Sequence, residues 1–193
     1  MAFRITGTFA RFFAAASLIA CSGASAATLE KLSLDQMSQK ATLIVRGRVT
    51  ACSGEAQGSL IYTRCQLAVT ETWKGSASGS VTFSIPGGQY QGMVQTFTGT
   101  PRITVDQEYV LFLWTGRSGR TQVIGLSQGV FDLVSGSRTT ASGATAKVRR
   151  GASTELMLDS SGKPVTDSTV EMSVADLRSK VNRALGRSGG VTQ

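Results

Sequence analysis

The chain has 193 residues, of which 41% are hydrophobic, and its 20 lysine and arginine residues against 12 acidic ones give a net charge of +8. This composition is typical of one globular domain and excludes a fibrous or largely disordered chain. Histidine is absent, which removes the commonest general base and the commonest metal ligand together. A chain of this size can bury about two-thirds of the surface that its unfolded form exposes, so its core needs no metal.

Residues 1–26 are typical of a secretory signal peptide. Arg4 and Arg11 form a basic start, residues 12–20 are apolar, and residues 24–26 form a small-residue cleavage site. A lipoprotein signal over residues 1–20 is the alternative, because residues 18–21 resemble a bacterial lipobox that would leave a lipidated Cys21 at the mature N-terminus. Both alternatives predict export: a periplasmic or secreted protein, anchored to the outer membrane if Cys21 is lipidated. No later segment is apolar enough to cross a membrane.

A short amphipathic helix is predicted at the start of the mature chain. Ser33 and Gln36 have the spacing of a capping box, in which the two side chains satisfy backbone N–H groups at a helix N-terminus. Leu34, Met37 and Ala41 follow at helical intervals.

Alternating apolar residues then predict a series of strands at residues 43–49, 60–73, 81–85 and 108–114, with two further pieces within 121–134. Gly47 suggests a bulge in the first strand. A polar turn is expected at residues 53–59, and residues 89–101 form a long connection with several glycines. This order predicts a mainly β fold, a small bent antiparallel barrel of the OB type over residues 27–134.

Residues 135–193 are predicted to be an extension of the barrel. Residues 135–153 are rich in Ser, Thr, Gly and Ala, which favours a flexible loop or an exposed hairpin tip. A short apolar strand is expected at residues 156–158. Ser173 and Asp176 resemble a second helix cap, and one apolar stripe follows, made of Val174, Leu177, Val181 and Leu185. The stripe predicts a C-terminal helix that packs on the barrel.

Cys52 and Cys65 are the internal cysteines that remain after removal of the signal. A pair of cysteines in an oxidising compartment predicts a disulfide. In a hairpin centred on the junction of Gly58 and Ser59 the two cysteines lie opposite each other. The same register would turn several apolar partners of these two strands to opposite faces of the sheet. A bulge at Gly47 would shift the pairing locally, so that the disulfide and a one-sided apolar face become compatible. A redox-active pair is the less favoured alternative, since the spacing is not C-x-x-C.

Three patterns raise the question of catalysis. Residues 125–129 match G-x-S-x-G around Ser127, but a nucleophile elbow needs a strand-to-helix turn and a histidine. Residues 160–163 match S-x-x-K without the companion motifs of the penicillin-recognising enzymes. Asp106 and Glu108 would share one face of a strand, at a strand entry where exposure is the ordinary state. We therefore expect no catalytic residue, no metal and no other cofactor, and a hydrolase using Ser127 is only a remote alternative.

Lys147, Arg149 and Arg150 form a nearly continuous basic cluster. A solvated basic face is the simpler interpretation. The functional alternative is contact with anionic phospholipid or another acidic polymer of the envelope. Nucleic-acid binding is not expected, because the aromatic residues, 7% of the chain, lie mostly in strands with a core pattern.

The sequence resembles a group of exported bacterial proteins of unassigned function. The resemblance covers about residues 29–134 and, more loosely, the C-terminal helix. It rests on an ordered set of segments: residues 43–49, 62–63, 69–75, 86–88, 99–101, 109–113 and 123–131. More distantly, the strand, variable loop, strand and Lys-Gly arrangement is similar to the netrin-like OB modules, which include the tissue inhibitors of metalloproteinases.

The resemblance implies a fold more than a role. In those inhibitors a cysteine at the mature N-terminus chelates the protease zinc through its amine and carbonyl, whereas this chain would begin with Ala27 or with an acylated Cys21. We expect an exported, non-enzymatic binding or scaffold module of the cell envelope, whose partner is an envelope or secreted protein. A secreted protease inhibitor of the netrin-like type is the alternative.

Overall fold

The computed structural model describes residues 28–134, 146–153 and 155–187. The predicted signal peptide with Cys21, and residues 135–145 of the predicted loop, lie outside these ranges. The elements in chain order are β1 (Leu29–Glu30), α1 (Leu34–Lys40), β2 (Leu43–Gln57), β3 (Leu60–Lys74), β4 (Ser80–Pro86), β5 (Gly88–Tyr90), β6 (Met93–Gln95), β7 (Glu108–Thr115), β8 (Thr121–Val123), the 3-10 helix η1 (Leu126–Gly129), β9 (Val130–Val134), β10 (Lys147–Arg150), β11 (Met157–Leu158), β12 (Pro164–Val165), β13 (Val170–Ser173) and α2 (Val174–Ala184).

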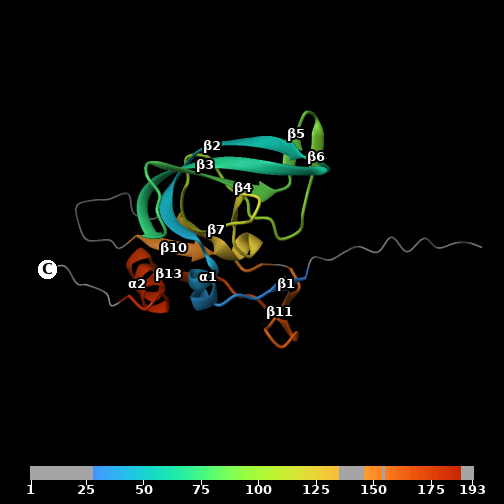
Figure 1. Ribbon diagram of the computed structural model, residues 1–193. Coiled ribbons are helices and arrows are strands. Elements are labelled where there is room, and N and C mark those ends of the chain that lie inside the picture. The colour runs from blue at the N-terminus through green and yellow to red at the C-terminus, as the bar shows by residue number, and fades with distance from the viewer. Residues whose placement is uncertain (1–27, 135–145, 154, 188–193) are drawn as a thin grey trace, which may run out of the picture.

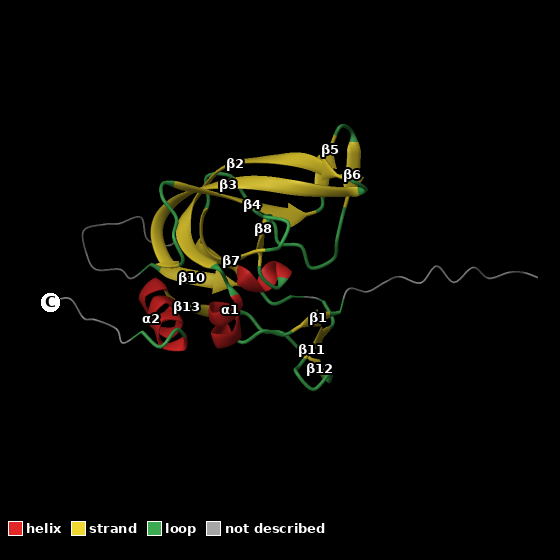
Figure 2. Ribbon diagram, in the orientation of Figure 1, coloured by secondary structure: helices red, strands yellow, loops and turns green. Residues whose placement is uncertain are grey.

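Five strands close into a small ring (Figures 1 and 2). Their order is β7-β2-β3-β4-β8, and β8 pairs again with β7. All of these pairs are antiparallel except β4 with β8, which meet in parallel at Ser84 and Gln122. A five-stranded, partly open barrel is the OB architecture. The predicted mainly β fold, an OB-like barrel with an N-terminal and a C-terminal helix, is confirmed.

The β2–β3 hairpin is longer and its turn tighter than the sequence pattern predicted. β2 continues to Gln57, so the polar turn expected at residues 53–59 is wrong, and the hairpin turns at Gly58 and Ser59 alone. Gly58 adopts a left-handed φ of 60°, which a two-residue hairpin needs. The register shifts between Arg46 and Gly47, as the expected bulge requires. A Cβ at Gly47 would lie 2.2 Å from the Ala68 carbonyl oxygen, so a side chain does not fit there.

β7 separates two hydrophobic cores. Tyr109, Leu111 and Leu113 point into the barrel core, and Val110 and Phe112 point into a second core between the sheet and the helices. Because alternate side chains of a strand face opposite sides, a strand buried on both faces has a continuous apolar sequence. This explains the dense apolar run that the sequence shows at residues 108–114.

The two helices pack side by side against the second core (Figure 2). Ser33 and Gln36 form the predicted capping box of α1, and the Ser173 hydroxyl accepts the Asp176 N–H at the start of α2. Leu177 and Val181 of α2 are fully buried in this core, as the apolar stripe predicted.

Three further strands, β9, β10 and β13, extend the sheet beyond β7. Of the two alternatives predicted for residues 135–153, a flexible loop or a hairpin tip, the loop does not extend over Lys147–Arg150, which pairs antiparallel with β9 on one side and β13 on the other. Val148 anchors the strand in the second core. The connection expected at residues 89–101 also contains structure, because β5 and β6 form a hairpin that turns at Gln91 and Gly92.

Candidate binding site

The predicted disulfide is present. Cys52 and Cys65 are direct partners in β2 and β3, and their Cα atoms lie 4.1 Å apart. Cys65 is buried in the barrel core and Cys52 packs partly against it. The bridge therefore cross-links the two strands of the long hairpin and stabilises the fold.

The predicted basic cluster is not one surface. Lys147 and Arg149 are exposed, but Arg150 points the other way and is buried. The Arg150 guanidinium donates to an Asp167 carboxylate oxygen at 2.8 Å and to the Ser168 carbonyl at 3.1 Å. Lys147 pairs with Glu171 at 3.3 Å. Arg150 therefore cannot contact an anionic surface, and the three-residue basic face is corrected to two exposed side chains.

Asp167 joins the N-terminal and C-terminal segments of the described chain. Its carboxylate accepts the Ser153 N–H at 2.9 Å, and Lys31 lies 4.0 Å away and donates to the Thr166 carbonyl at 2.7 Å. Burial raises the pKa of Asp167, but the Ser153 N–H and the Arg150 guanidinium outweigh burial, so the pKa lies below its ordinary value. The network stabilises the fold and offers no open site.

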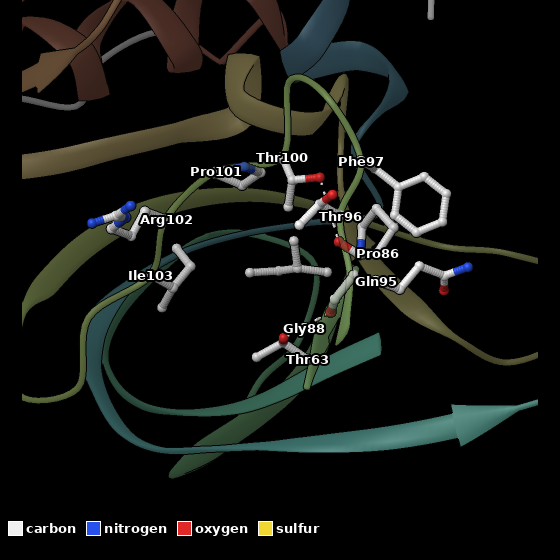
Figure 3. A pocket seen from close by; sticks show the side chains of 12 residues that line it. Thr63, Pro86, Gly88, Gln95, Thr96, Phe97, Thr100, Pro101, Arg102 and Ile103 are labelled. Carbon is white, nitrogen blue, oxygen red and sulfur yellow. Dashed lines mark hydrogen bonds between the residues drawn. The ribbon is translucent and has the colours of Figure 1, made fainter. Parts of the chain in front are cut away.

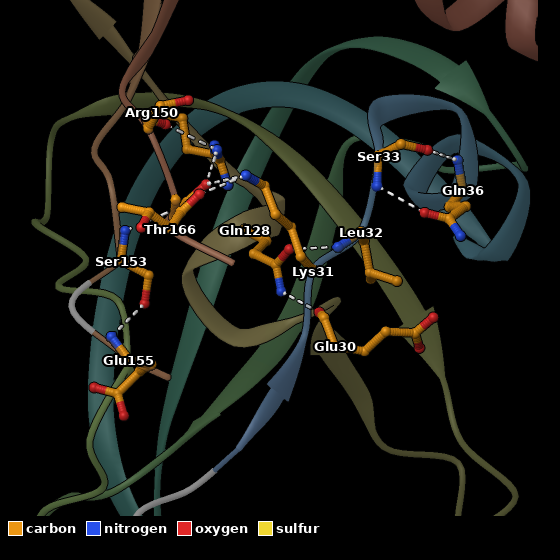
Figure 4. A network of polar contacts seen from close by, with 12 residues as sticks. Glu30, Lys31, Leu32, Ser33, Gln36, Gln128, Arg150, Ser153, Glu155 and Thr166 are labelled. Carbon is orange, nitrogen blue, oxygen red and sulfur yellow. Dashed lines mark hydrogen bonds and ion pairs between the residues drawn. The ribbon is translucent and has the colours of Figure 1, made fainter. Parts of the chain in front are cut away.

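The G-x-S-x-G match also has a structural explanation. Its buried side chain is that of Gln128, whose amide donates to the Glu30 carbonyl at 2.9 Å and accepts the Leu32 N–H at 2.8 Å (Figure 4). Ser127 lies on the four-residue 3-10 helix η1, which leads directly into β9, and not at a turn from a strand into an α-helix. The segment thus holds the chain at Glu30 and Leu32 against the barrel.

Asp106 and Glu108 do not share a strand face, because β7 begins at Glu108 and Asp106 lies in the preceding turn with a left-handed φ of 67°. Glu108 accepts a hydrogen bond from the Arg46 Nε at 2.8 Å, and the same guanidinium donates to Glu71 at 2.7 Å. Burial raises the pKa of Glu71, but hydrogen bonds from Trp73 and Arg46 outweigh it and the pKa is lowered. Glu71 of β3 and Glu108 of β7 are therefore the two partners of Arg46, which lies on the strand between them, β2.

A pocket of about 340 Å³ lies where β4 ends and the chain turns toward β5 (Figure 3). Gly87 and Gly88 have φ values of 89° and 129°, and this backbone lets the chain leave β4. Residues 95–103 then return across the opening. The apolar side chains of its wall are Ile85, Pro86, Phe97, Pro101 and Ile103.

The polar groups of the wall are largely bonded to one another. Thr63 donates its hydroxyl to the Gly87 carbonyl at 2.8 Å, and Thr100 donates to the Pro86 carbonyl at 3.4 Å. Two of the three threonine hydroxyls in the wall thus donate to carbonyl groups of the wall, and the pocket presents a mainly apolar surface. A pocket with few polar groups is the usual form of a site for an apolar ligand or side chain.

Arg102 is the one charged side chain among the described residues that line the pocket, and it is exposed. No salt bridge within the described ranges involves it. Its guanidinium is therefore available to an anion at the pocket.

Four exposed apolar side chains belong to the start of β3 and to the segment of β6 and Phe97 that leads into the pocket wall, and we call them the apolar end: Leu60, Met93, Val94 and Phe97. Val94 is 70% exposed, which is unusual for a valine in a strand. The Gln95 side chain accepts the Ile61 N–H at 2.7 Å, which holds the β5–β6 hairpin beside the start of β3. Clustered exposed apolar residues mark interaction surfaces.

Sequence patterns missed the pocket and the apolar end. The available signal was the Gln91-Gly92 pair between short apolar segments, which is compatible with a two-residue hairpin turn.

No protein-family model matches the sequence, and a search of curated proteins found no match. Within the described ranges, no helix has the length and apolar character to cross a membrane. No group of three or more Cys, Asp or Glu side chains in this part of the chain could hold a metal ion.

Proposed function

We propose that this chain is an exported, non-enzymatic binding module of the cell envelope, and that the pocket and the apolar end form its binding site. One observation carries the proposal: exposed apolar side chains gather beside an apolar pocket in which Arg102 is the one charged group of the described lining. A guanidinium stays protonated and cannot act as a general base. The lining is therefore suited to binding rather than to acid–base catalysis.

The proposed partner is another exported protein that presents an apolar side chain beside a carboxylate. The pocket volume of about 340 Å³ lies near the lower limit for ligand sites and matches a small apolar group. Arg102 complements a negative charge next to that group. Without residues 1–26 the chain keeps 18 basic and 12 acidic residues, and this net charge of +6 favours an acidic partner.

Site-specific photocrosslinking in the exporting cell tests the proposal. A photoreactive phenylalanine analogue replaces Val94 in one variant and Ser179, an exposed residue of α2, in the control variant. We expect a discrete adduct from position 94 and none of that mass from position 179. Arg102→Glu should weaken the adduct at least tenfold, and Arg117→Glu, which changes the charge equally at another exposed arginine, should leave it unchanged.

Two results would contradict the proposal. One is the same set of adducts from positions 94 and 179, since the apolar end would then have no special role. The other is turnover of an ester, peptide or glycoside substrate by purified mature protein that Ser127→Ala abolishes. Dose-dependent inhibition of a co-exported protease, lost in Arg102→Glu, would identify the partner as a protease.

A further inference from the structure

A second hollow, which we call the polar groove, lies along β3 and β4. Two adjoining depressions of about 330 and 320 Å³ form it, and they share Arg64 and Thr82. Hydroxyl and guanidinium groups dominate its wall, in contrast to the apolar pocket. Glu55 is the one carboxylate among the described residues that line it.

Arg120 is a fixed part of this wall. Its guanidinium stacks on the Tyr62 ring at 3.9 Å from the centroid, donates to a Glu55 carboxylate oxygen at 2.9 Å, and donates to the Gln57 side chain. Only 17% of the Arg120 side chain is exposed. Glu55 therefore neutralises Arg120, and this pair ties the β2–β3 hairpin to the turn between β7 and β8.

Arg64 is free by comparison. Its side chain is 57% exposed, and the nearest carboxylate oxygen, that of Glu55, lies 3.7 Å away, beyond hydrogen-bond distance. Two arginines thus share one carboxylate, which leaves the groove one positive charge in excess. A guanidinium presents a planar set of donors that can bind two oxygens of a carboxylate or phosphate at once.

Hydroxyl groups surround the free guanidinium. Thr82 lines both depressions, and Ser84 and Ser118 line the one that contains Arg120. The Ser84 hydroxyl lies 3.5 Å from Glu55, whereas Thr82 and Ser118 are exposed. Hydroxyls beside a guanidinium match a ligand that carries its own hydroxyls next to an anionic group.

We propose that the polar groove binds an acidic polysaccharide. The Arg64 guanidinium holds a carboxylate or phosphate substituent of the polymer, and the Thr82 and Ser118 hydroxyls hydrogen-bond to the adjoining sugar hydroxyls. This site shares no lining residue with the pocket and does not depend on the function proposed for it. The proposed contact with an anion therefore lies on β3, and not on Lys147 and Arg149, the two exposed basic residues of β10.

Binding of purified mature protein to immobilised polymers tests the groove. The probes are polygalacturonate, which carries carboxylates, phosphorylated dextran, which carries phosphates, and neutral dextran. We expect binding to at least one anionic polymer and none to neutral dextran, and the preferred polymer identifies the anionic group. Arg64→Gln should weaken binding at least tenfold. Thr82→Val should weaken it severalfold with no change of charge.

Arg149→Gln is the matched control, because Arg149 is an exposed arginine of β10 and the charge change is the same. We expect it to alter binding less than twofold. Equal weakening by Arg64→Gln and Arg149→Gln would overturn the proposal, since binding would then follow net charge. Absence of wild-type binding to both anionic polymers would overturn it as well. Each variant should melt at the wild-type temperature, so that a loss of binding does not reflect a loss of folding.

Discussion

The ion pair between Arg150 and Asp167 gives the sharpest test of the fold. The Asp167 side chain is 0% exposed and that of Arg150 is 8% exposed, so the pair belongs with buried salt bridges. Removing one partner of such a pair leaves an uncompensated buried charge and typically costs about 3–5 kcal/mol. In Arg150→Met the Asp167 carboxylate keeps the Ser153 N–H, with Lys31 4.0 Å away, so we expect a loss near the lower value, about 3 kcal/mol.

The double variant Arg150→Met/Asp167→Asn separates this explanation from a loss of packing. The asparagine oxygen can still accept the Ser153 N–H, and no buried charge is left, so we expect stability within about 1 kcal/mol of wild type. Urea unfolding at pH 7, followed by circular dichroism, measures both free energies. A loss below about 1 kcal/mol in Arg150→Met, or an equal loss in the single and double variants, would refute the argument.

Acid should weaken the same contact, because the pKa of Asp167 in the folded protein lies below its ordinary value of 3.8. The stability that the ionised carboxylate contributes is present above pH 3.8 and is lost as the pH falls through the folded-state pKa. In an acid titration from about pH 5 to about pH 2, wild type should therefore lose more stability than Asp167→Asn. Replacing Cys52 and Cys65 with serine should lower the free energy of unfolding in urea by about 3 kcal/mol, because the bridge closes a loop with a sequence separation of 13. If two free thiols titrate in denatured, unreduced wild type, the bridge does not exist. Leu177→Ala should cost about 2–5 kcal/mol because the side chain is fully buried, and an unchanged melting temperature would show that α2 contributes nothing to the core. The intact mass of protein from the native envelope should correspond to a chain that begins at Ala27 or at a lipidated Cys21, and a full-length product would contradict export.

Local patterns predicted the elements whose causes are local. Serine caps at Ser33 and Ser173 satisfy N–H groups within the next turn, and both formed as predicted. The position of Cys52 and Cys65 about the Gly58-Ser59 turn likewise depends on a short stretch of chain. Alternation of apolar residues identified the barrel strands because burial of one face imposes a period of two.

The remaining features depend on contacts between distant segments. Arg150 points inward because Asp167, 17 residues away, accepts its hydrogen bond, and a pattern that places every arginine on the surface cannot predict this. The composition of residues 135–153 likewise predicts only a loop or a hairpin tip and not the pairing of Lys147–Arg150 with β13. The pocket has the same origin, since Thr63, Ile85 and residues 95–103 meet only when the barrel closes.

Because residues 109–113 of β7 are buried on both faces, the barrel and the helices share their central strand. Loss of the helices would expose Val110 and Phe112, and loss of the barrel would expose Tyr109, Leu111 and Leu113. Neither half can therefore melt while the other keeps its full stability. Heating should produce one calorimetric transition, and a destabilising substitution in α2 should increase hydrogen exchange in the barrel strands as well as in the helix.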